Sequence, residues 1–326
     1  MRKLRDLICS AAALGVAMLA ATAPASAQVV VYNTVGTKLM QAFVEGFEKV
    51  NPGIKVDVIS GGAGELLTRV KAERNRPQGD VFVGPDADSF DAELDLFDSY
   101  KSTEDAAFDR GVVHKDFKYY GFSMNFQAFI VNTKMMPLSV APKSWTDLAK
   151  PEYKGKIVMA NPAQSGSAYS QLHQIVQLHN WDLVGKLVTN ATFVNSSRLA
   201  FQNVARGEAP IGLTSEFNIL VQKLEGQPVD GIYPADGTAL VIDASGIIKG
   251  GPNPANARKF LDFINSKAAH EILVAVDKRR SARSDVAPPQ GLPAIASLKT
   301  FPYDSVGAAN NRKATLERFD KLLAAK

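Results

Sequence analysis

The sequence predicts an α/β fold of two lobes, each a central, mostly parallel sheet flanked by helices, with a ligand cleft at the hinge. From residue 28 onward, short β-branched or apolar runs alternate with longer stretches of helical spacing, which is typical of a largely parallel sheet. Removing the first 27 of 326 residues leaves 299, roughly the length of two domains of about 150 residues. No Ser/Gly-rich linker divides them, so we expect strands that cross between the lobes.

The first 27 residues have the order of a secretory signal peptide. Three basic residues within the first five positions precede an apolar run at 7–23, and Ala25, Ser26 and Ala27 follow it. This A-x-A pattern predicts cleavage before Gln28. The run is short and rich in alanine, whereas a membrane-spanning helix needs about 20 apolar residues. We therefore expect a chain that is exported and released.

Cysteine content and charge exclude several classes of protein. Cys9 is the one cysteine and lies within the signal peptide, so the exported chain has no thiol for a disulfide or a thiolate metal site. Residues 1–27 carry +2 of the formal net charge of +4, which leaves +2 on the exported chain. A charge so nearly balanced gives no reason to expect nucleic acid as a partner.

The opening elements predict a βαβ unit. Residues 29–32 and 54–59 are β-branched or apolar and are predicted as strands. Between them Leu39, Phe43 and Phe47 recur at the spacing of one helix face, until an Asn-Pro pair ends the helix.

The same alternation continues to the end of the chain. Further strands are predicted at 81–83, 126–131, 156–159, 193–195, 211–213 and 231–233. Further helices are predicted at 64–74, 167–178, 254–264 and 312–324. We assign residues 28–125 with 245–300 to the first lobe and 126–244 with 301–326 to the second.

Three segments have the composition of anion-binding loops, at 34–37, 60–65 and 165–169. Each lies before a predicted helix, where unpaired amides favour an anion, glycine allows close approach, and Ser or Thr adds a hydroxyl donor. Ordinary helix caps and turns have the same composition, so that alternative stays open for each loop. The candidate ligand-binding residues are Thr34, Thr37, Ser60, Gly61, Gly62, Ser165, Gly166 and Ser167.

Polar residues also follow two strands of the second lobe. Thr214, Ser215 and Glu216 follow 211–213, and Asp236 follows 231–233. Their carboxylates could accept hydrogen bonds from hydroxyl groups or pair with an ammonium group. Glu216 has an alternative role as a first-turn acid that complements the helix dipole.

The sequence contains no motif of a catalytic or metal centre. Its four histidines are scattered, and it has no HExxH, no G-x-S-x-G elbow and no Walker loop. Ser167 has no base near it in the sequence, which a nucleophile requires. His173 and His179 are interpreted as solvated side chains. We expect neither an enzyme nor a bound cofactor.

Six segments follow the pattern of one protein family. They are YNTVGTKL at 32–39, GGAGELLTRVKAE at 61–73, GDVFVGPDAD at 79–88, KPEYKGKIVMANP at 150–162, SGSAY at 165–169 and GGPNPANARKFLDFINS at 250–266. Through them the chain resembles ferric-binding and related type II solute-binding proteins of ABC importers. The resemblance implies a monomer of the periplasm that closes two lobes on a small-molecule ligand and delivers it to an inner-membrane permease.

The resemblance does not extend to the iron ligands. Ferric-binding members hold iron with two adjacent tyrosines shortly after the segment that reads GEAPIGL here, often with a histidine from the first loop. The matching positions carry Phe217 and Asn218, and Gly36 or Thr37 stands where the histidine would be. Without phenolate or imidazole ligands, an Fe(III) site is disfavoured.

The loop that receives a phosphate in ferric binders matches Ser165, Gly166 and Ser167. An anion loop kept without the iron tyrosines predicts a ligand with its own phosphate or phosphonate. Members that resemble this chain in that respect bind sugar phosphates or aminoalkylphosphonates. Alternatives are ferric iron held through chelators such as citrate, a carboxylate or polyamine, and a secreted phosphate-ester hydrolase using the same loops.

Overall fold

A computed structural model describes residues 27–326, and the predicted α/β class is confirmed. Its 11-stranded sheet has the order β2-β1-β3-β9-β4-β7-β5-β6, with β8 and β10 also paired to β4 and β11 to β9. The signal peptide predicted over residues 1–27 lies, apart from Ala27, outside the described residues. No helix in 27–326 is long and apolar enough to cross a membrane.

The strands are β1 (Ala27–Asn33), β2 (Ile54–Ser60), β3 (Val81–Asp86), β4 (Tyr120–Asn132), β5 (Ile157–Ala160), β6 (Ala191–Val194), β7 (Ile211–Ser215), β8 (Val229–Ile232), β9 (Thr238–Ile247), β10 (Arg280–Ser281) and β11 (Thr300–Phe301). The helices are α1 (Thr37–Val50), α2 (Ala63–Ala72), α3 (Ala87–Asp91), α4 (Gly166–Leu178), α5 (Trp181–Asn190), α6 (Ser197–Ala205), α7 (Glu216–Leu224), α8 (Pro254–Asn265), α9 (Lys267–Asp277), α10 (Ser305–Asn310) and α11 (Arg312–Ala324).

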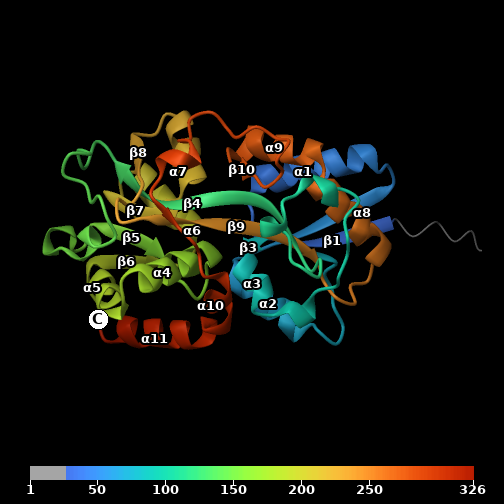
Figure 1. Cartoon of the computed structure of the whole chain (residues 1–326), viewed down its shortest axis with the longest axis horizontal. Helices are drawn as coiled ribbons and strands as arrows, with labels where there is room; N and C mark the ends of the chain where they lie inside the picture. Colours follow the sequence, from blue (N-terminus) through green and yellow to red (C-terminus); the bar gives the residue numbers. More distant parts are fainter. Residues whose placement is uncertain (1–26) are drawn as a thin grey trace, which may run out of the picture.

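Strands β4 and β9 run through both lobes (Figure 1), which confirms the expectation of crossing strands. The first half of β4 pairs antiparallel with β9, from Tyr120 opposite Ser245 to Phe126 opposite Leu240. The second half pairs with β7 and β8. Only 126–131 of β4 was predicted, and β9 was missed, because Ser, Asn, Asp and Gly interrupt the apolar runs of these strands.

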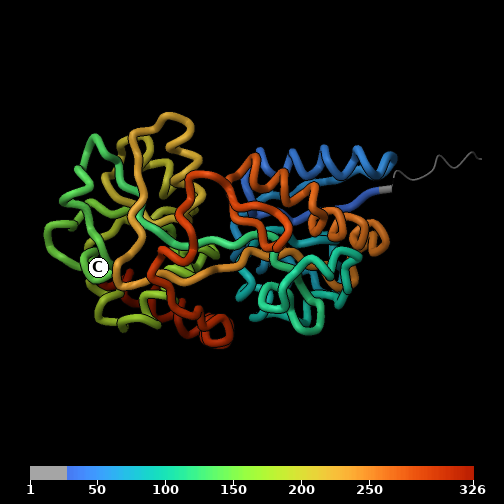
Figure 2. Tube along the Cα trace, turned by 45° about the horizontal axis from the view of Figure 1, so that its top comes forward, coloured from blue at the N-terminus to red at the C-terminus, as the bar shows by residue number. Residues whose placement is uncertain are grey.

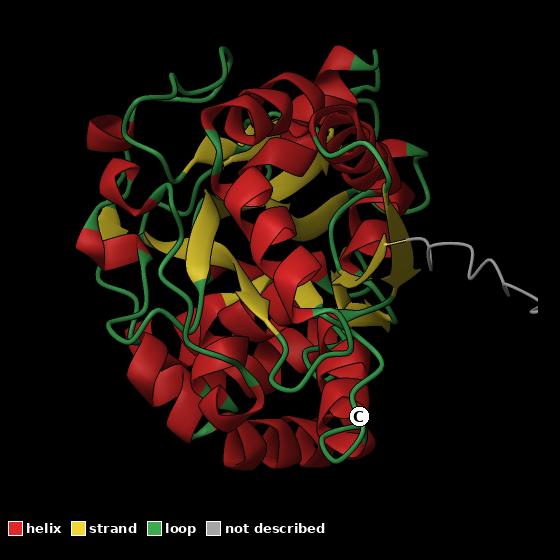
Figure 3. Cartoon of the chain, turned by 90° about the vertical axis from the view of Figure 1, so that its right-hand side faces the viewer, coloured by secondary structure: helices red, strands yellow, loops and turns green. Residues whose placement is uncertain are grey.

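The first lobe has parallel strands β2, β1 and β3 covered by helices on both faces (Figure 3). On one face the α1 stripe of Leu39, Phe43 and Phe47 packs with β1, α8 and α9. On the other face Leu66 and Phe90, from α2 and α3, pack against the sheet. The apolar spacing read in the sequence therefore gives one side of this core directly.

The second lobe repeats this arrangement around parallel strands β7, β5 and β6. Helices α4 and α5 cover one face with Leu172 and Leu187, and α11 adds Phe319 to the same cluster. Helix α6 covers the other face through Val204. The connection from β10 to β11 runs along both lobes (Figure 2), and on this path Gly291 lies against Leu220 of α7.

Candidate functional site

The carboxyl ends of parallel strands from both lobes face the boundary between the lobes. Strands β2 and β3 of the first lobe end at Ser60 and Asp86, while β5 and β7 of the second end at Ala160 and Ser215. Helices α2, α3, α4 and α7 begin directly or within a few residues after these ends. In open α/β sheets, ligands collect beyond the carboxyl ends of strands.

Two of the three predicted loops meet across this boundary. A Cβ placed on Gly62 would lie 2.6 Å from the carbonyl oxygen of Gln164, and one on Gly64 would clash with the carbonyl oxygen of Ala163. A Cβ on Gly166 would lie 3.4 Å from that of Ala63. The start of α2 therefore touches the start of α4, and glycine lets the two backbones approach.

The predicted ligand-binding residues of the first lobe differ in how far they are buried. Thr34 is half-buried, and its Oγ1 would be 2.6 Å from a Cβ on Gly84, which has φ +102. Thr37 and Ser60 are exposed and line a cavity of about 490 Å³ between α1 and β2. Gly61 and Gly62 follow Ser60 in the chain, and Gly62 makes the contact with Gln164.

The loop of the second lobe caps α4. Ser165 Oγ accepts a hydrogen bond from the Ala168 amide at 3.3 Å and lies 3.2 Å from Ser167 Oγ. Ser165 thus has the capping role that was left open as an alternative. The first amides of a helix have no carbonyl one turn earlier, so those of Gly166 and Ser167 are available to an acceptor.

Glu216 lies in the interior, bound by other side chains. Its carboxylate forms a bidentate ion pair with Arg280 at 2.8 and 3.0 Å and accepts the Tyr233 hydroxyl at 2.6 Å. Burial, followed by the charge of Glu216, raises the pKa of Tyr233, so the phenol stays a neutral donor. Arg280 belongs to β10, which pairs with β4 at Met124, so this ion pair spans the hinge.

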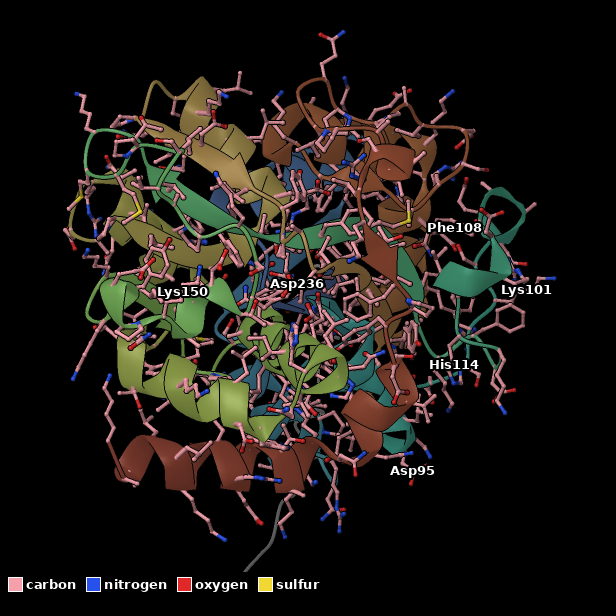
Figure 4. The ribbon with its side chains drawn as sticks, turned by 60° about the vertical axis from the view of Figure 1, so that its left-hand side comes forward. Asp95, Lys101, Phe108, His114, Lys150 and Asp236 are labelled. Carbon is pink, nitrogen blue, oxygen red and sulfur yellow. The ribbon has the colours of Figure 1, made fainter. Side chains whose placement is uncertain are left out.

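The other predicted residues of the second lobe are also hydrogen-bonded within the chain. Thr214 Oγ1 accepts from Asn218 at 2.9 Å, and Ser215 Oγ accepts from Gln127 at 3.2 Å. Asp236 (Figure 4) caps the turn after Ser144: it accepts the Trp145 and Thr146 amides and pairs with His179 at 2.9 Å. These bonds hold Asp236 to its own lobe, and none joins it to the three loops.

Sequence reasoning missed two buried carboxylates between the lobes. Asp86 ends β3 and is 5% exposed, and Asp243 of β9 is 4% exposed and stands opposite it in the sheet. The Ser170 hydroxyl of α4 donates to Asp86 across the lobe boundary. Burial, then the charges of Asp243 and Asp88, raises the pKa of Asp86. The position of Asp86 at the carboxyl end of a strand was the sequence signal that could have identified it as a candidate site residue.

Asp243 is held by an arginine that packs on an aromatic ring. Arg279 Nη1 lies 2.5 Å from Asp243, and its guanidinium is 3.8 Å from the centre of the Phe217 ring. Asp243 also accepts from Ser123 and Asn125. By the family resemblance, Phe217 stands where ferric-binding members carry an iron-ligating tyrosine. Its ring therefore packs against the cationic guanidinium of Arg279 instead of binding a metal. Among residues 27–326 no group of three or more His, Cys, Asp or Glu side chains could hold a metal.

The C-terminal segment, which belongs to the second lobe, contacts helix α3 of the first lobe. Tyr303 donates to Asp88 of α3 at 2.7 Å, and Arg312 lies 3.4 Å from the same carboxylate. The interpretation of His173 as solvated was wrong: its ring is buried and packs edge-on against Tyr303. Burial lowers the pKa of His173.

Comparison with known proteins places these features in a family. Residues 28–275 match the model of the family described as bacterial extracellular solute-binding protein. An uncharacterized protein of Haemophilus influenzae is 30% identical over 317 residues, which is 91% of each chain. A putative 2-aminoethylphosphonate-binding periplasmic protein of Salmonella typhimurium is 28% identical over 262 residues, 76% of this chain and 75% of that protein.

Solved structures share the whole fold. The periplasmic binding protein AfuA from Actinobacillus pleuropneumoniae, with fructose-6-phosphate bound, has a TM-score of 0.86 and 24% identity, covering 92% of this chain and 99% of that one. Iron-bound HitA from Pseudomonas aeruginosa has a TM-score of 0.80 and 18% identity, covering 91% and 99%. Both are two-lobed binding proteins, as predicted for this chain.

Removal of the charge of Glu216 is expected to destabilise the hinge. Glu216→Gln leaves the buried Arg280 without its carboxylate, which costs about 3–5 kcal/mol of unfolding free energy. Glu208→Gln is the matched control: its ion pair with Arg206 is exposed, 53% and 52% for the two side chains, and contributes about 0–1 kcal/mol. Urea unfolding of both variants measures the difference, and equal losses would contradict this account.

Asp86→Asn is expected to stabilise the protein increasingly as pH rises. Below about pH 3, Asp86 is protonated in both the folded and the unfolded chain. At higher pH the unfolded chain releases this proton first, because the folded-state pKa is raised, so wild-type stability falls while Asn does not titrate. The difference in Tm between variant and wild type should grow from pH 4 to pH 8. A difference that stays constant or shrinks contradicts the raised pKa.

Proposed function

Because this chain belongs to the bacterial extracellular solute-binding proteins, the binding components of ABC importers, we propose that its solute is a small organic anion carrying a phosphate or phosphonate group. The chain would capture this solute in the periplasm as a monomer and present it to an inner-membrane permease. The two lobes proposed as the units that close on it are 28–125 with 245–300 and 126–244 with 301–326.

The observation that carries the proposal is the meeting of two helix starts from opposite lobes. The loop at 60–65 touches the loop at 165–169 through Ala63 and Gly166, and it touches the preceding residue Gln164 through Gly62. Helix starts present unpaired amides and a positive dipole end, which together favour an oxyanion. An anion between these loops would receive donors from both lobes, so its binding would favour the closed arrangement.

Similar proteins support the same class of solute. The Salmonella typhimurium relative is named as a putative 2-aminoethylphosphonate-binding protein, and AfuA has been solved with fructose-6-phosphate. Both of these solutes combine a phosphorus oxyanion with groups that donate hydrogen bonds. The relatives named here are binding proteins, which supports binding without catalysis. The hydroxyl of Ser167 lies near that of Ser165, and within residues 27–326 no histidine is hydrogen-bonded to it.

Ferric iron is the second candidate because relatives bind it. The major ferric iron-binding protein of Neisseria gonorrhoeae is 26% identical over 321 residues, 93% of this chain and 95% of that protein. Phe217 and Asn218 count against direct iron binding, since Phe217 packs under Arg279 and Asn218 donates to Thr214. A ferric chelate that brings its own ligands is the form of this candidate that needs testing.

A thermal-shift screen of the exported chain tests the solute class. The compounds are hexose phosphates, glycerol phosphate, 2-aminoethylphosphonate, inorganic phosphate and ferric citrate. A solute at a hundredfold excess over its Kd stabilises the folded state by about 2.7 kcal/mol, so Tm should rise clearly for an organophosphorus compound. A rise with ferric citrate alone would replace the proposal by the iron alternative.

Gly64→Ala tests whether contact between the loops accompanies binding. Alanine favours helix α2 by about 1 kcal/mol, so the lobe itself should not lose stability. The added Cβ meets the Ala163 carbonyl only when the lobes are closed, and such overpacking costs about 1–3 kcal/mol. Calorimetric titration should therefore show affinity reduced by about one to two powers of ten.

Gly111→Ala is the control, because a Cβ there has nothing within 4 Å. Undiminished affinity in Gly64→Ala would mean that the solute binds without bringing these loops together.

A further inference from the structure

Resting on the proposed function, we infer that the solute also carries a primary ammonium group, received between the lobes by Asp86 and Gln171. The solute is then a short zwitterion of the aminoalkylphosphonate class. A phosphorylated sugar, whose other groups are neutral hydroxyls, would be a poor ligand.

The first argument is the balance of buried charge. Three carboxylates of this region have a guanidinium partner: Asp243 pairs with Arg279, Glu216 with Arg280, and Asp88 with Arg312. Asp86 is equally buried, yet within residues 27–326 no Lys, Arg or His forms a salt bridge with it. Its donor is the neutral hydroxyl of Ser170. Without a countercharge a buried carboxyl keeps its proton, as the raised pKa of Asp86 indicates, and a cationic group of the solute would take the place of that proton.

The second argument is the direction of the hydrogen bonds in a series of three side-chain amides. The Asp243 carboxylate can only accept from Asn125, which turns the Asn125 oxygen toward Gln127. Gln127 therefore donates to Asn125, and its own oxygen accepts from Gln171 Nε2 at 2.7 Å. Gln171 is left with its oxygen, Oε1, which is buried and has no hydrogen-bond donor. The orientation of all three amides is thus fixed by Asp243.

Asp86, which has no cationic partner, and Gln171 Oε1, which has no donor, are reached from the same helix. Gln171 follows Ser170 in α4, and the Ser170 hydroxyl donates to Asp86, so the carboxylate without a cation and the amide oxygen without a donor are both linked to the same turn of α4 at the lobe boundary. An ammonium group has three N–H donors and one positive charge. It therefore supplies what both acceptors lack, whereas a hydroxyl supplies a donor without charge.

The position of this pair relative to the anion loop sets the length of the solute. Ser167 and Gln171 are one helical turn apart on α4, about 6 Å along the axis. An oxyanion at the helix start and an ammonium group one turn further would be joined by a short skeleton. Opening of the lobes breaks the bond between Asp86 and Ser170, which belong to different lobes, and gives the solute access.

Calorimetric titration of the exported wild-type chain with 2-aminoethylphosphonate and ethylphosphonate tests the inference. The two compounds differ only in the amino group. Ethylphosphonate is expected to bind about a hundredfold more weakly, since loss of one member of a buried charge pair costs affinity on that scale. This comparison requires no variant and therefore does not depend on the folding of one.

The variant Asp86→Asn identifies the residue. It should reduce the affinity for 2-aminoethylphosphonate to near that for ethylphosphonate, while ethylphosphonate binds it at least as well as the wild type. Asp109→Asn, an exposed aspartate, is the control and should keep the full preference. A preference retained by Asp86→Asn would overturn the assignment to Asp86.

The remaining outcomes separate this inference from the proposed function. Equal binding of the two phosphonates, or tight binding of a hexose phosphate with no binding of 2-aminoethylphosphonate, overturns the ammonium site and leaves the organophosphorus solute. Absence of binding by every phosphonate and phosphate ester overturns the proposed function and the inference together.

Discussion

The backbone hydrogen bonds between β4 and β9 join the two lobes into one sheet. Both strands pass from the first lobe to the second, so residues far apart in sequence, such as Asn125 and Asp243, become neighbours at the hinge. A hinge of this kind holds the lobes at a fixed distance while small changes in backbone angles alter the angle between them. Every polar contact proposed for the solute depends on this arrangement.

Ion pairs buried at the hinge constrain the positions of the two lobes relative to each other. Arg279 and Arg280 are adjacent in sequence, yet one holds Asp243 of β9 and the other holds Glu216 of α7. Burying a charge costs several kcal/mol unless it is paired, so these partners are strongly constrained. Asp86 lacks such a partner within the described residues, and this difference from Asp243 and Glu216 is why we propose it as a binding residue.

The aromatic residue at 217 shows how one fold accommodates different solutes. In ferric-binding relatives the resemblance places a metal-ligating tyrosine at this position. Here Phe217 has no oxygen, and its ring faces the guanidinium of Arg279, which in turn holds Asp243. The same position in the fold thus supports a network of ion pairs and amides, and this network is one reason why we propose an organic solute and not a bare metal ion.

The sequence by itself determined the α/β class, the apolar stripe of α1 and the helix-start loops, because helix periodicity and capping are set by residues close together in the chain. The tertiary structure decided which loops meet, and it brought Gly62 beside Gln164 while keeping Asp236 within its own lobe. It also decided that the Glu216 carboxylate has a guanidinium partner, whereas the Asp86 carboxylate has no cationic partner within the described residues. The cost of a buried charge depends on partners brought near by folding, and no local pattern in the sequence reveals them.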